Sequence, residues 1–541
     1  MKIIKGKVVD IINKTIFNGE LAVEDGFITH IQKVDEEFSQ FIIPGFVDAH
    51  VHVESSMLIP SEFARLAVCH GTVGTISDPH EIGNVLGKDG VRFMIDNGAK
   101  TPFKFYFGAP SCVPATTFET AGAEITASDI EEIFSWPNVN YLAEMMNYPG
   151  VLHTDSTVMD KIAIAKKHNK LIDGHAPGLR GEDAKKYISA GISTDHECFT
   201  KEEALDKLQH GMKIIIREGS AAKNFEALWE LIDEYPEMVM LCSDDKHPND
   251  LVVGHINKLA ARAIAKGCDL FNVLRAASYN PVNHYKMDIG LLQTGNKADF
   301  CIVDNLKDFN VLSTYIDGVE VAKNGTSEFS SIKEENLNNF HCSPISEVQI
   351  QLKDESNCVK VIVVDDGQLI TKAATSELKS INRNLQPDIT NDILKIVVVN
   401  RYNGAPPAVS FIKNVGLKKG AIASCVAHDS HNIVAVGTND TDICKAVNLI
   451  IEAKGGISLA DGENSKILEL PMAGIMSAKD GYEVTKHYEE IDKAAKGLGT
   501  SLTSPFMTLS FCALLVIPEL KLSDKGLFDA NTFSLTSSYS E

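Results

Sequence analysis

The sequence predicts an α/β protein: a (β/α)₈ TIM-like barrel with a composite β-sandwich domain and a C-terminal α+β domain. Short apolar runs alternate with helical stretches in the middle of the chain, β-rich segments flank them, and the pattern changes after residue 340. The chain has 541 residues, more than the roughly 250–300 residues that a single core usually supports. We expect a composite β domain at 1–43 plus 288–335, a catalytic barrel at 44–287 and a C-terminal domain at 340–541.

The first 43 residues show the alternation of apolar and polar residues that is typical of β-strands. The runs IIKGKVVDII, ELAVEDG and FITHIQKV have this pattern, and Asn18 and Gly19 mark a turn. The pattern returns in GLLQTGNKADFCIVDN and YIDGVEVAKNG, which lie between residues 290 and 325. We expect these two segments to pair into one small β domain that the barrel interrupts.

The middle region is organised as repeated βα units. Helical segments with apolar residues at three- and four-residue steps, such as 156–168 and 200–211, separate the strand candidates. Eight such units over one region predict a barrel, whereas the alternative, an open doubly wound sheet, rarely needs eight strands. The candidates are FVDAHVH, TVGTISD, FKFYFGA, NYLAEMM, KLIDGHA, GISTDHE, MKIIIREG and MVMLCSDD.

The C-terminal region mixes strand-like and helical patterns. We expect strands in EVQIQLKDESN (347–357) and VKVIVVDDGQLI (359–370), followed by a mixed segment that KIVVVNRYNGAPPAV opens. The longest apolar run, 506–517, lies between two prolines and is shorter than the ~20 residues of a membrane helix. We therefore expect a buried core segment there and no membrane association.

Composition restricts the partners and the compartment. With 51 Lys and Arg against 73 Asp and Glu, the net charge is −22, which disfavours nucleic acids and anionic membranes and suits a neutral or cationic small molecule. The 11 cysteines are scattered, without a CxxC pair, as in reduced intracellular proteins. The N-terminus lacks the apolar run of a signal peptide, so we expect a cytoplasmic protein.

Residues of metal-ligand type end five of the eight strand candidates. His50 and His52 share one face of the first strand because residues i and i+2 point the same way. Two histidines with backbone partners inside a barrel would be the simpler explanation, but ligand types at four other strand ends favour a metal site. These residues are Glu144, His175, His196 and Asp244.

The number of ligands predicts two metal ions. Four imidazoles and two carboxylates exceed the three protein ligands of one catalytic zinc, and Glu144 is the ionisable residue that can bridge from strand four. No Lys occurs between Lys104 and Lys161, which excludes a carboxylated lysine on that strand. Nitrogen and oxygen ligands suit Mn²⁺, Fe²⁺ or Zn²⁺; we expect two divalent ions per subunit, with Mn²⁺ or Fe²⁺ ahead of Zn²⁺.

Several motifs together resemble the adenine deaminase branch of the amidohydrolase superfamily. The resemblance follows the chain in order and covers almost its whole length, with Gly83 where the family's DPHEIANV motif has Ala. The motifs are PGFVDAHVHVESSMLIPSEFA, GTVGTISDPHEIGNVLG, AEMMNYPGV, DGHAPGL, TDHE, REGSAAKN, CSDDKHP, VAHDSHNIVAVGTND and LPMAGIMS.

The resemblance implies a binuclear centre and a reaction. His50, His52 and Asp244 would hold one ion, His175 and His196 the other, and Glu144 would bridge them. A hydroxide activated there would convert adenine and water to hypoxanthine and ammonia, in purine salvage. Alternatives are hydrolysis of another cyclic amide or aminated heterocycle, or a non-catalytic barrel scaffold. We expect a homo-oligomer, as a homodimer.

The chemistry requires a proton shuttle, because attack at C6 demands protons at N1 and at the departing nitrogen. We assign this role to Asp244, with Glu144 as the second catalytic residue. Glu197 and Asp245 are neighbouring acids, but strand alternation is expected to point them away from the metals.

Four further residues are candidates for substrate binding: Glu54, His80, Arg217 and Glu218. Glu54 continues the strand face of His52, although it is equally an ordinary polar residue at a strand end. His80 lies in SDPHE, where Asp78 is explained as a helix N-cap. Arg217 and Glu218 end strand seven, where they are alternatively a structural ion pair.

Two patterns suggest no further cofactor. His428, Asp429 and His431 are interpreted as structural or loop-ordering residues, because no third remote ligand is assignable. The glycine-containing runs GTVGT and GGIS lack the spacing of nucleotide-binding loops.

Overall fold

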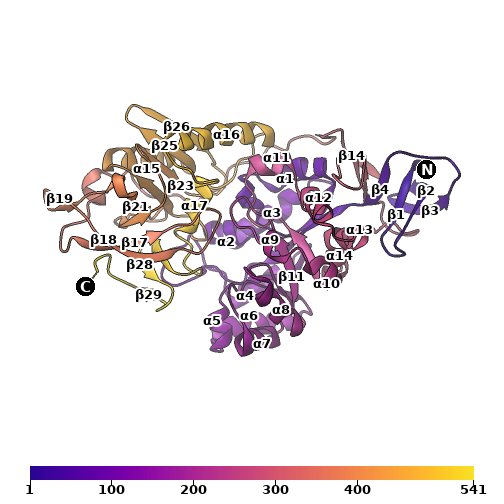
Figure 1. Ribbon diagram of the computed structural model, residues 1–541, viewed down its shortest axis with the longest axis horizontal. Coiled ribbons are helices and arrows are strands. Elements are labelled where there is room, and N and C mark those ends of the chain that lie inside the picture. Colours follow the sequence, from indigo (N-terminus) through magenta and orange to yellow (C-terminus); the bar gives the residue numbers. More distant parts are fainter. Residues whose placement is uncertain (541) are drawn as a thin grey trace.

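The computed structural model describes residues 1–540, and its centre is a closed barrel of parallel strands (Figure 1). Ser193 N donates to Ile172 O (2.9 Å), and Asp244 N donates to His50 O (3.0 Å), so the two parallel sheets β5–β9 and β10–β12 join at both seams. Each strand coincides with one of the predicted runs. They are β5 (Phe46–Val51), β6 (Thr72–Ser77), β7 (Lys104–Ala109), β8 (Val139–Met145), β9 (Leu171–Gly174), β10 (Thr194–Asp195), β11 (Lys213–Arg217) and β12 (Val239–Cys242).

Amphipathic helices cover the outside of the barrel. Helix α6 (Ser156–Lys167) begins where Asp155 accepts hydrogen bonds from Thr157 N and Val158 N, and it buries Ile162. Residues 224–235, between β11 and β12, form two short helices, α9 (Phe225–Leu228) and α10 (Leu231–Glu234). Other helices are α1 (Pro60–Ala67), α2 (His80–Leu86), α3 (Lys88–Gly98), α7 (Gly181–Ser189), α8 (Lys201–Gln209), α11 (Pro248–Val253) and α12 (Ile256–Lys266).

Two segments far apart in the sequence form one sheet at the side of the barrel. Strand β4 (Phe41–Pro44) pairs in parallel with β1 (Lys2–Asp10) and antiparallel with β13 (Phe300–Val303), which links the segments. The sheet continues through β2 (Thr15–Glu24) and β3 (Phe27–Lys33) on one side and β14 (Val311–Ile316), β15 (Val319–Lys323) and β16 (Thr326–Ser327) on the other. The exact domain boundaries stay a prediction.

The C-terminal region is a β-rich α+β unit at the opposite end of the molecule (Figure 1). Its main sheet has the order β18-β17-β22-β21-β24-β23-β25-β26. The strands are β17 (Cys358–Val363), β18 (Lys372–Glu377), β21 (Ile393–Val399), β22 (Ala408–Lys413), β23 (Ala421–Ser424), β24 (Ile433–Gly437), β25 (Gly456–Asp461) and β26 (Asn464–Glu469). Helices α15 (Asp440–Ala453), α16 (Gly481–Gly497) and α17 (Pro505–Phe511) complete the unit.

Two C-terminal predictions have different outcomes. The strand expected at 347–357 is wrong: Glu347–Ile350 form a 3₁₀ turn because Ser346 and Gln349 make a reciprocal capping box. The apolar run 506–517 does lie in the core, since Phe506, Leu509 and Phe511 are buried. Over residues 1–540, none of the helices combines the length and apolar character needed to cross a bilayer.

The C-terminal region packs directly on the barrel. One apolar core includes Phe63 and Leu66 of α1 together with Met472 and Val484. Ser477 N donates to Met57 O (2.8 Å), and Gly481 N donates to a Glu62 carboxylate (2.9 Å). The C-terminal region therefore lies fixed beside the ends of the barrel strands.

Candidate active site

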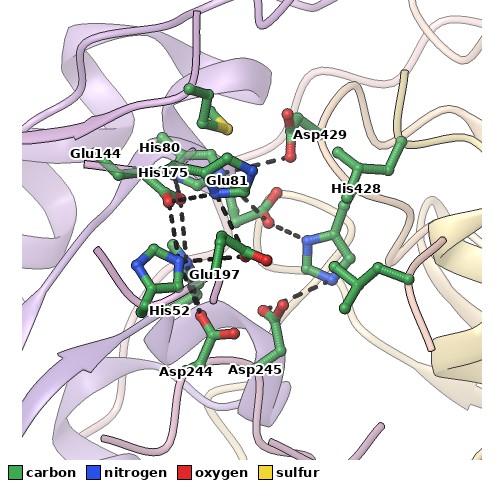
Figure 2. Close-up of a pocket in the computed structure, with 14 residues that line it drawn as sticks. His52, His80, Glu81, Glu144, His175, Glu197, Asp244, Asp245, His428 and Asp429 are labelled. Carbon is green, nitrogen blue, oxygen red and sulfur yellow. Dashed lines mark hydrogen bonds and ion pairs between the residues drawn. The ribbon is translucent and has the colours of Figure 1, made fainter. Parts of the chain in front are cut away.

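Three ligand-type side chains converge where β5 and β12 end, and two of them, His52 and Asp244, are labelled in Figure 2. The Nε2 atoms of His50 and His52 are 3.1 Å apart, and Asp244 Oδ1 lies 3.5 Å from the first and 3.4 Å from the second. All three side chains are buried. Barrel closure produces this grouping, because Asp244 N donates to His50 O and His52 N donates to Asp244 O (3.3 Å).

A second group forms around the Glu144 carboxylate. Glu144 Oε2 is 2.8 Å from His175 Nδ1 and 3.2 Å from His196 Nε2. The other oxygen, Oε1, lies 3.4 Å from His52 Nε2. The carboxylate therefore faces both groups, as a shared ligand would.

These donors fit divalent metal ions. The nitrogen and oxygen atoms of the first group, from the ends of β5 and β12, sit 3.1–3.5 Å apart, which suits atoms that surround a common ion. His52 Nδ1 donates to Asp78 O (3.2 Å), and this contact turns Nε2 toward the group. Every sequence-predicted ligand is thus brought to one of the two groups.

Arg217 fixes the orientation of two carboxylates. Its guanidinium donates to Asp244 Oδ2 (2.8 Å) and Glu197 Oε2 (2.7 Å), rather than pairing with Glu218. Although burial raises the pKa of Asp244, Arg217 and the two imidazoles hold that pKa well below its usual range. Glu218 does not join either group of ligand-type residues. It follows the end of β11, and its Oε2 lies 2.7 Å from Arg262.

The expectation that Glu197 and Asp245 point away is wrong. Both side chains line the cavity that the two ligand groups border. Glu197 Oε1 is 3.5 Å from His175 Nδ1, and Asp245 Oδ1 accepts a hydrogen bond from Ser55 Oγ at 2.5 Å. The alternation argument fails because β10 ends at Asp195 and β12 ends at Cys242, so neither residue has strand geometry.

Glu54 lies behind α2 rather than on a strand face. It belongs to a 3₁₀ turn (Val53–Ser56), and its Oε1 accepts a hydrogen bond from Ile82 N at 3.2 Å. Burial raises the pKa of Glu54 to about 7. Glu54 therefore does not continue the strand face of His52, as we expected. It instead accepts a hydrogen bond from the first turn of α2.

The DPHE motif supplies the next wall of the cavity. His80 Nδ1 is 3.2 Å from Asp78 Oδ1, and its Nε2 is 3.5 Å from Asp429 Oδ1. Asp78 accepts from His80 N (3.1 Å) at the start of α2 and from Glu144 N (3.1 Å). The N-cap of α2 is Pro79, so the expected N-cap role of Asp78 is wrong; its carboxylate instead holds the backbone amides of His80 and Glu144.

The C-terminal region contributes residues that sequence reasoning left outside the site. Glu81 binds the imidazoles of His428 and His431, the latter at 2.5 Å. Burial lowers the pKa of His428, but Glu81 and Asp245 together raise it to about 9. The remote partner of His428 and His431 is thus Glu81, a carboxylate of the barrel. This pairing is visible only in the folded structure. Leu369, Leu514, His428 and Asp429 line the cavity of about 20 Å³ (Figure 2).

Comparison with known proteins shows which family this chain resembles. The amidohydrolase family model matches residues 41–321, and the model of the adenine deaminase C-terminal domain matches residues 368–534. A relative named adenine deaminase from Sulfurovum sp. (strain NBC37-1) is 56% identical over 532 residues, 98% of each chain. A relative of the same name from Methanosarcina mazei is 51% identical over 554 residues, 100% of each chain.

A third relative of that name, from Borreliella burgdorferi, is 48% identical over 538 residues, 98% of each chain. Together with the closed parallel barrel, these matches confirm the predicted fold class and the resemblance seen in the motifs. The chain therefore belongs to the amidohydrolase family, in its adenine deaminase branch.

Proposed function

We propose that the chain hydrolyses adenine to hypoxanthine and ammonia with two divalent metal ions, in purine salvage. The observation that carries the proposal is the Glu144 carboxylate, which faces two separate groups of buried ligand atoms. The names of the relatives supply the substrate. The donors are imidazole and carboxylate without thiolate, which suits Mn²⁺, Fe²⁺ or Zn²⁺ alike, and Mn²⁺ or Fe²⁺ are the ions we expect first.

In this proposal the ligands divide as the distances suggest. His50, His52 and Asp244 would hold one ion, His175 and His196 would hold the other, and Glu144 would be shared. When bound, such ions lower the pKa of water and thereby supply hydroxide at neutral pH.

The protein's own contribution is proton transfer. Arg217 keeps Asp244 ionised and aimed at the first group, so its carboxylate can accept a proton from the attacking water. The same carboxylate then returns this proton to the amino nitrogen that leaves as ammonia, and the second proton of the water passes from the oxygen on C6 to N1 to give hypoxanthine. Glu197, held by the same guanidinium, is the nearest further carboxylate that faces the cavity.

The purine would lie between the ligand groups and the C-terminal region. His80, His428 and Asp429 are the polar groups on that wall, while Leu369 and Leu514 supply apolar surface. A cavity of about 20 Å³ has room for about one water molecule. Adenine is larger than this space, so its binding requires side chains that line the cavity to move.

The test is a product assay on metal-stripped enzyme to which Mn²⁺, Fe²⁺ or Zn²⁺ is returned separately. We expect equal amounts of hypoxanthine and ammonia from adenine, and no turnover before metal is added. Dihydroorotate, hydantoin and cytosine serve as comparison substrates. Absence of adenine turnover in fully metal-loaded protein, or faster turnover of a comparison substrate, would overturn the proposal.

A further inference from the structure

A second cavity, of about 210 Å³, lies between the loops that follow β11 and β12. Its wall adjoins the candidate active site, because Ser220 N in the first loop donates to Asp245 O in the second (2.8 Å). The backbone of these two loops therefore lies between this cavity and the side chains of Asp244 and Asp245. The charged residues around it are Glu218, Lys223, Lys246, Asp250, Lys258 and Arg262.

In this cavity both acidic side chains have partners, whereas three of the basic side chains do not. Both acids are engaged: Glu218 Oε2 lies 2.7 Å from Arg262, and Asp250 accepts a hydrogen bond from the Ser220 hydroxyl. Within residues 1–540, by contrast, the ammonium groups of Lys223, Lys246 and Lys258 make neither a hydrogen bond nor an ion pair with a protein group.

The position of Lys246 makes this imbalance informative. Its side chain is only 9% exposed, whereas Lys223 and Lys258 are exposed. Lys223 repels the Lys246 ammonium group, whereas the carboxylates of Glu218 and Asp250 attract it. Four basic side chains therefore line the cavity against two carboxylates, and these two are already engaged by Arg262 and Ser220.

We propose that this cavity binds a small anion that carries a phosphate group. Three ammonium donors around one space can each donate to a phosphate oxygen, and such charge-assisted hydrogen bonds are strong. The loops after the seventh and eighth strands are also where barrels frequently bind phosphate. Free phosphate and a phosphate monoester share this chemistry. The inference does not depend on the reaction at the metal groups.

The test is calorimetric titration of the metal-loaded full-length protein with inorganic phosphate at constant ionic strength. We expect saturable binding that becomes about tenfold weaker in Lys246→Gln and in Lys258→Gln, since each removes one charged donor. Lys307→Gln, an exposed lysine on the β domain, is the matched control and keeps wild-type affinity. Lys258 is exposed and distant in sequence from the metal-type residues, so its variant remains informative if Lys246→Gln misfolds.

A parallel titration with ribose 5-phosphate distinguishes the two sources of phosphate. Tighter binding than inorganic phosphate would identify a monoester as the ligand, and weaker binding would identify the free ion. Affinity that is equal in wild type and both cavity variants would place the anion elsewhere, for example on the metal ions, and would overturn the inference. A lack of saturable binding would overturn it as well.

Discussion

Asp244 adopts a left-handed backbone conformation, with φ of 54°, just after β12 ends. This conformation is unfavourable for most residues but is tolerated by Asp and Asn. It turns the carboxylate back toward His50 and His52 while its backbone closes the barrel. Asp244 therefore serves both the left-handed backbone turn and the proposed proton transfer. Asn can adopt the same backbone conformation but lacks the carboxylate, so this substitution separates the two roles.

We predict that Asp244→Asn folds normally and lowers kcat for adenine by about 10²–10⁴-fold, because the amide cannot accept and return a proton. Steady-state kinetics, circular dichroism and metal analysis of the purified variant test this. Asp25→Asn is the matched control, since Asp25 is exposed and also left-handed, with φ of 48°. Wild-type activity in Asp244→Asn with full metal content would show that another group moves the proton.

Glu119 predicts a pH dependence of stability. Burial, with Asp429 and Asp524 nearby, raises the pKa of this carboxyl to about 8 from 4.5. The folded state thus keeps a proton that the unfolded chain releases above pH 4.5, so this contribution to stability is full below pH 4.5. It declines by about 1.4 kcal/mol per pH unit as pH rises toward 8.

Glu119→Gln should remove this dependence. We expect the Tm of the variant to rise relative to wild type between pH 5 and pH 8, as measured by thermal unfolding at intervals across that range. Glu182→Gln, whose side chain is 89% exposed, should track wild type throughout. A difference between Glu119→Gln and wild type that does not change with pH would contradict the protonated state.

At the scale of elements, the strand ends show what sequence patterns can predict. Short apolar runs between helical stretches located the barrel strands, and the rule that active sites lie at their carboxyl ends brought His50, Glu144, His175 and Asp244 together. Alternation failed for Glu197 and Asp245 because the strands stop before them. A pattern predicts a strand, but the hydrogen bonds of closure decide where it ends.

The loop between β23 and β24 could not be placed from sequence in the same way. His428 meets Glu81 across a separation of 347 residues, and each residue lies in a motif that has an ordinary local explanation. The partner of His428 is determined by how the C-terminal region packs on the barrel. The role of this loop is thus a property of packing between two units rather than of either sequence segment.

We predict that His428→Ala lowers kcat/KM for adenine by about 10–100-fold, because the cavity loses a cationic wall and Glu81 loses a charged partner. Full kinetic curves with metal-loaded protein measure the effect, and metal content should remain at the wild-type level. His487→Ala on the exposed face of α16 is the control. An unchanged kcat/KM would leave the loop without a part in catalysis.

At the scale of the whole molecule, the candidate ligands connect separate parts of the barrel. They lie at or just beyond the ends of β5, β8, β9, β10 and β12, which belong to both parallel sheets. The apolar core continues from the barrel into the C-terminal region. Ions bound by these residues would therefore hold the strand ends together and stabilise a structure that we expect to unfold as one unit.

Metal removal should consequently lower thermal stability as well as activity. Binding of an ion at about 1,000 times its Kd contributes about 4 kcal/mol to the folded state, so we expect chelation to lower the Tm by several degrees and returned Mn²⁺ to restore it. Differential scanning calorimetry with elemental analysis of the same samples measures both quantities. His50→Asn with His52→Asn should start from a lower Tm and respond less to chelation, because one ligand group is already lost. Equal Tm values for loaded and demonstrably stripped wild-type protein would mean that the strand ends are held by the protein alone, and the ligand assignment would then need another basis.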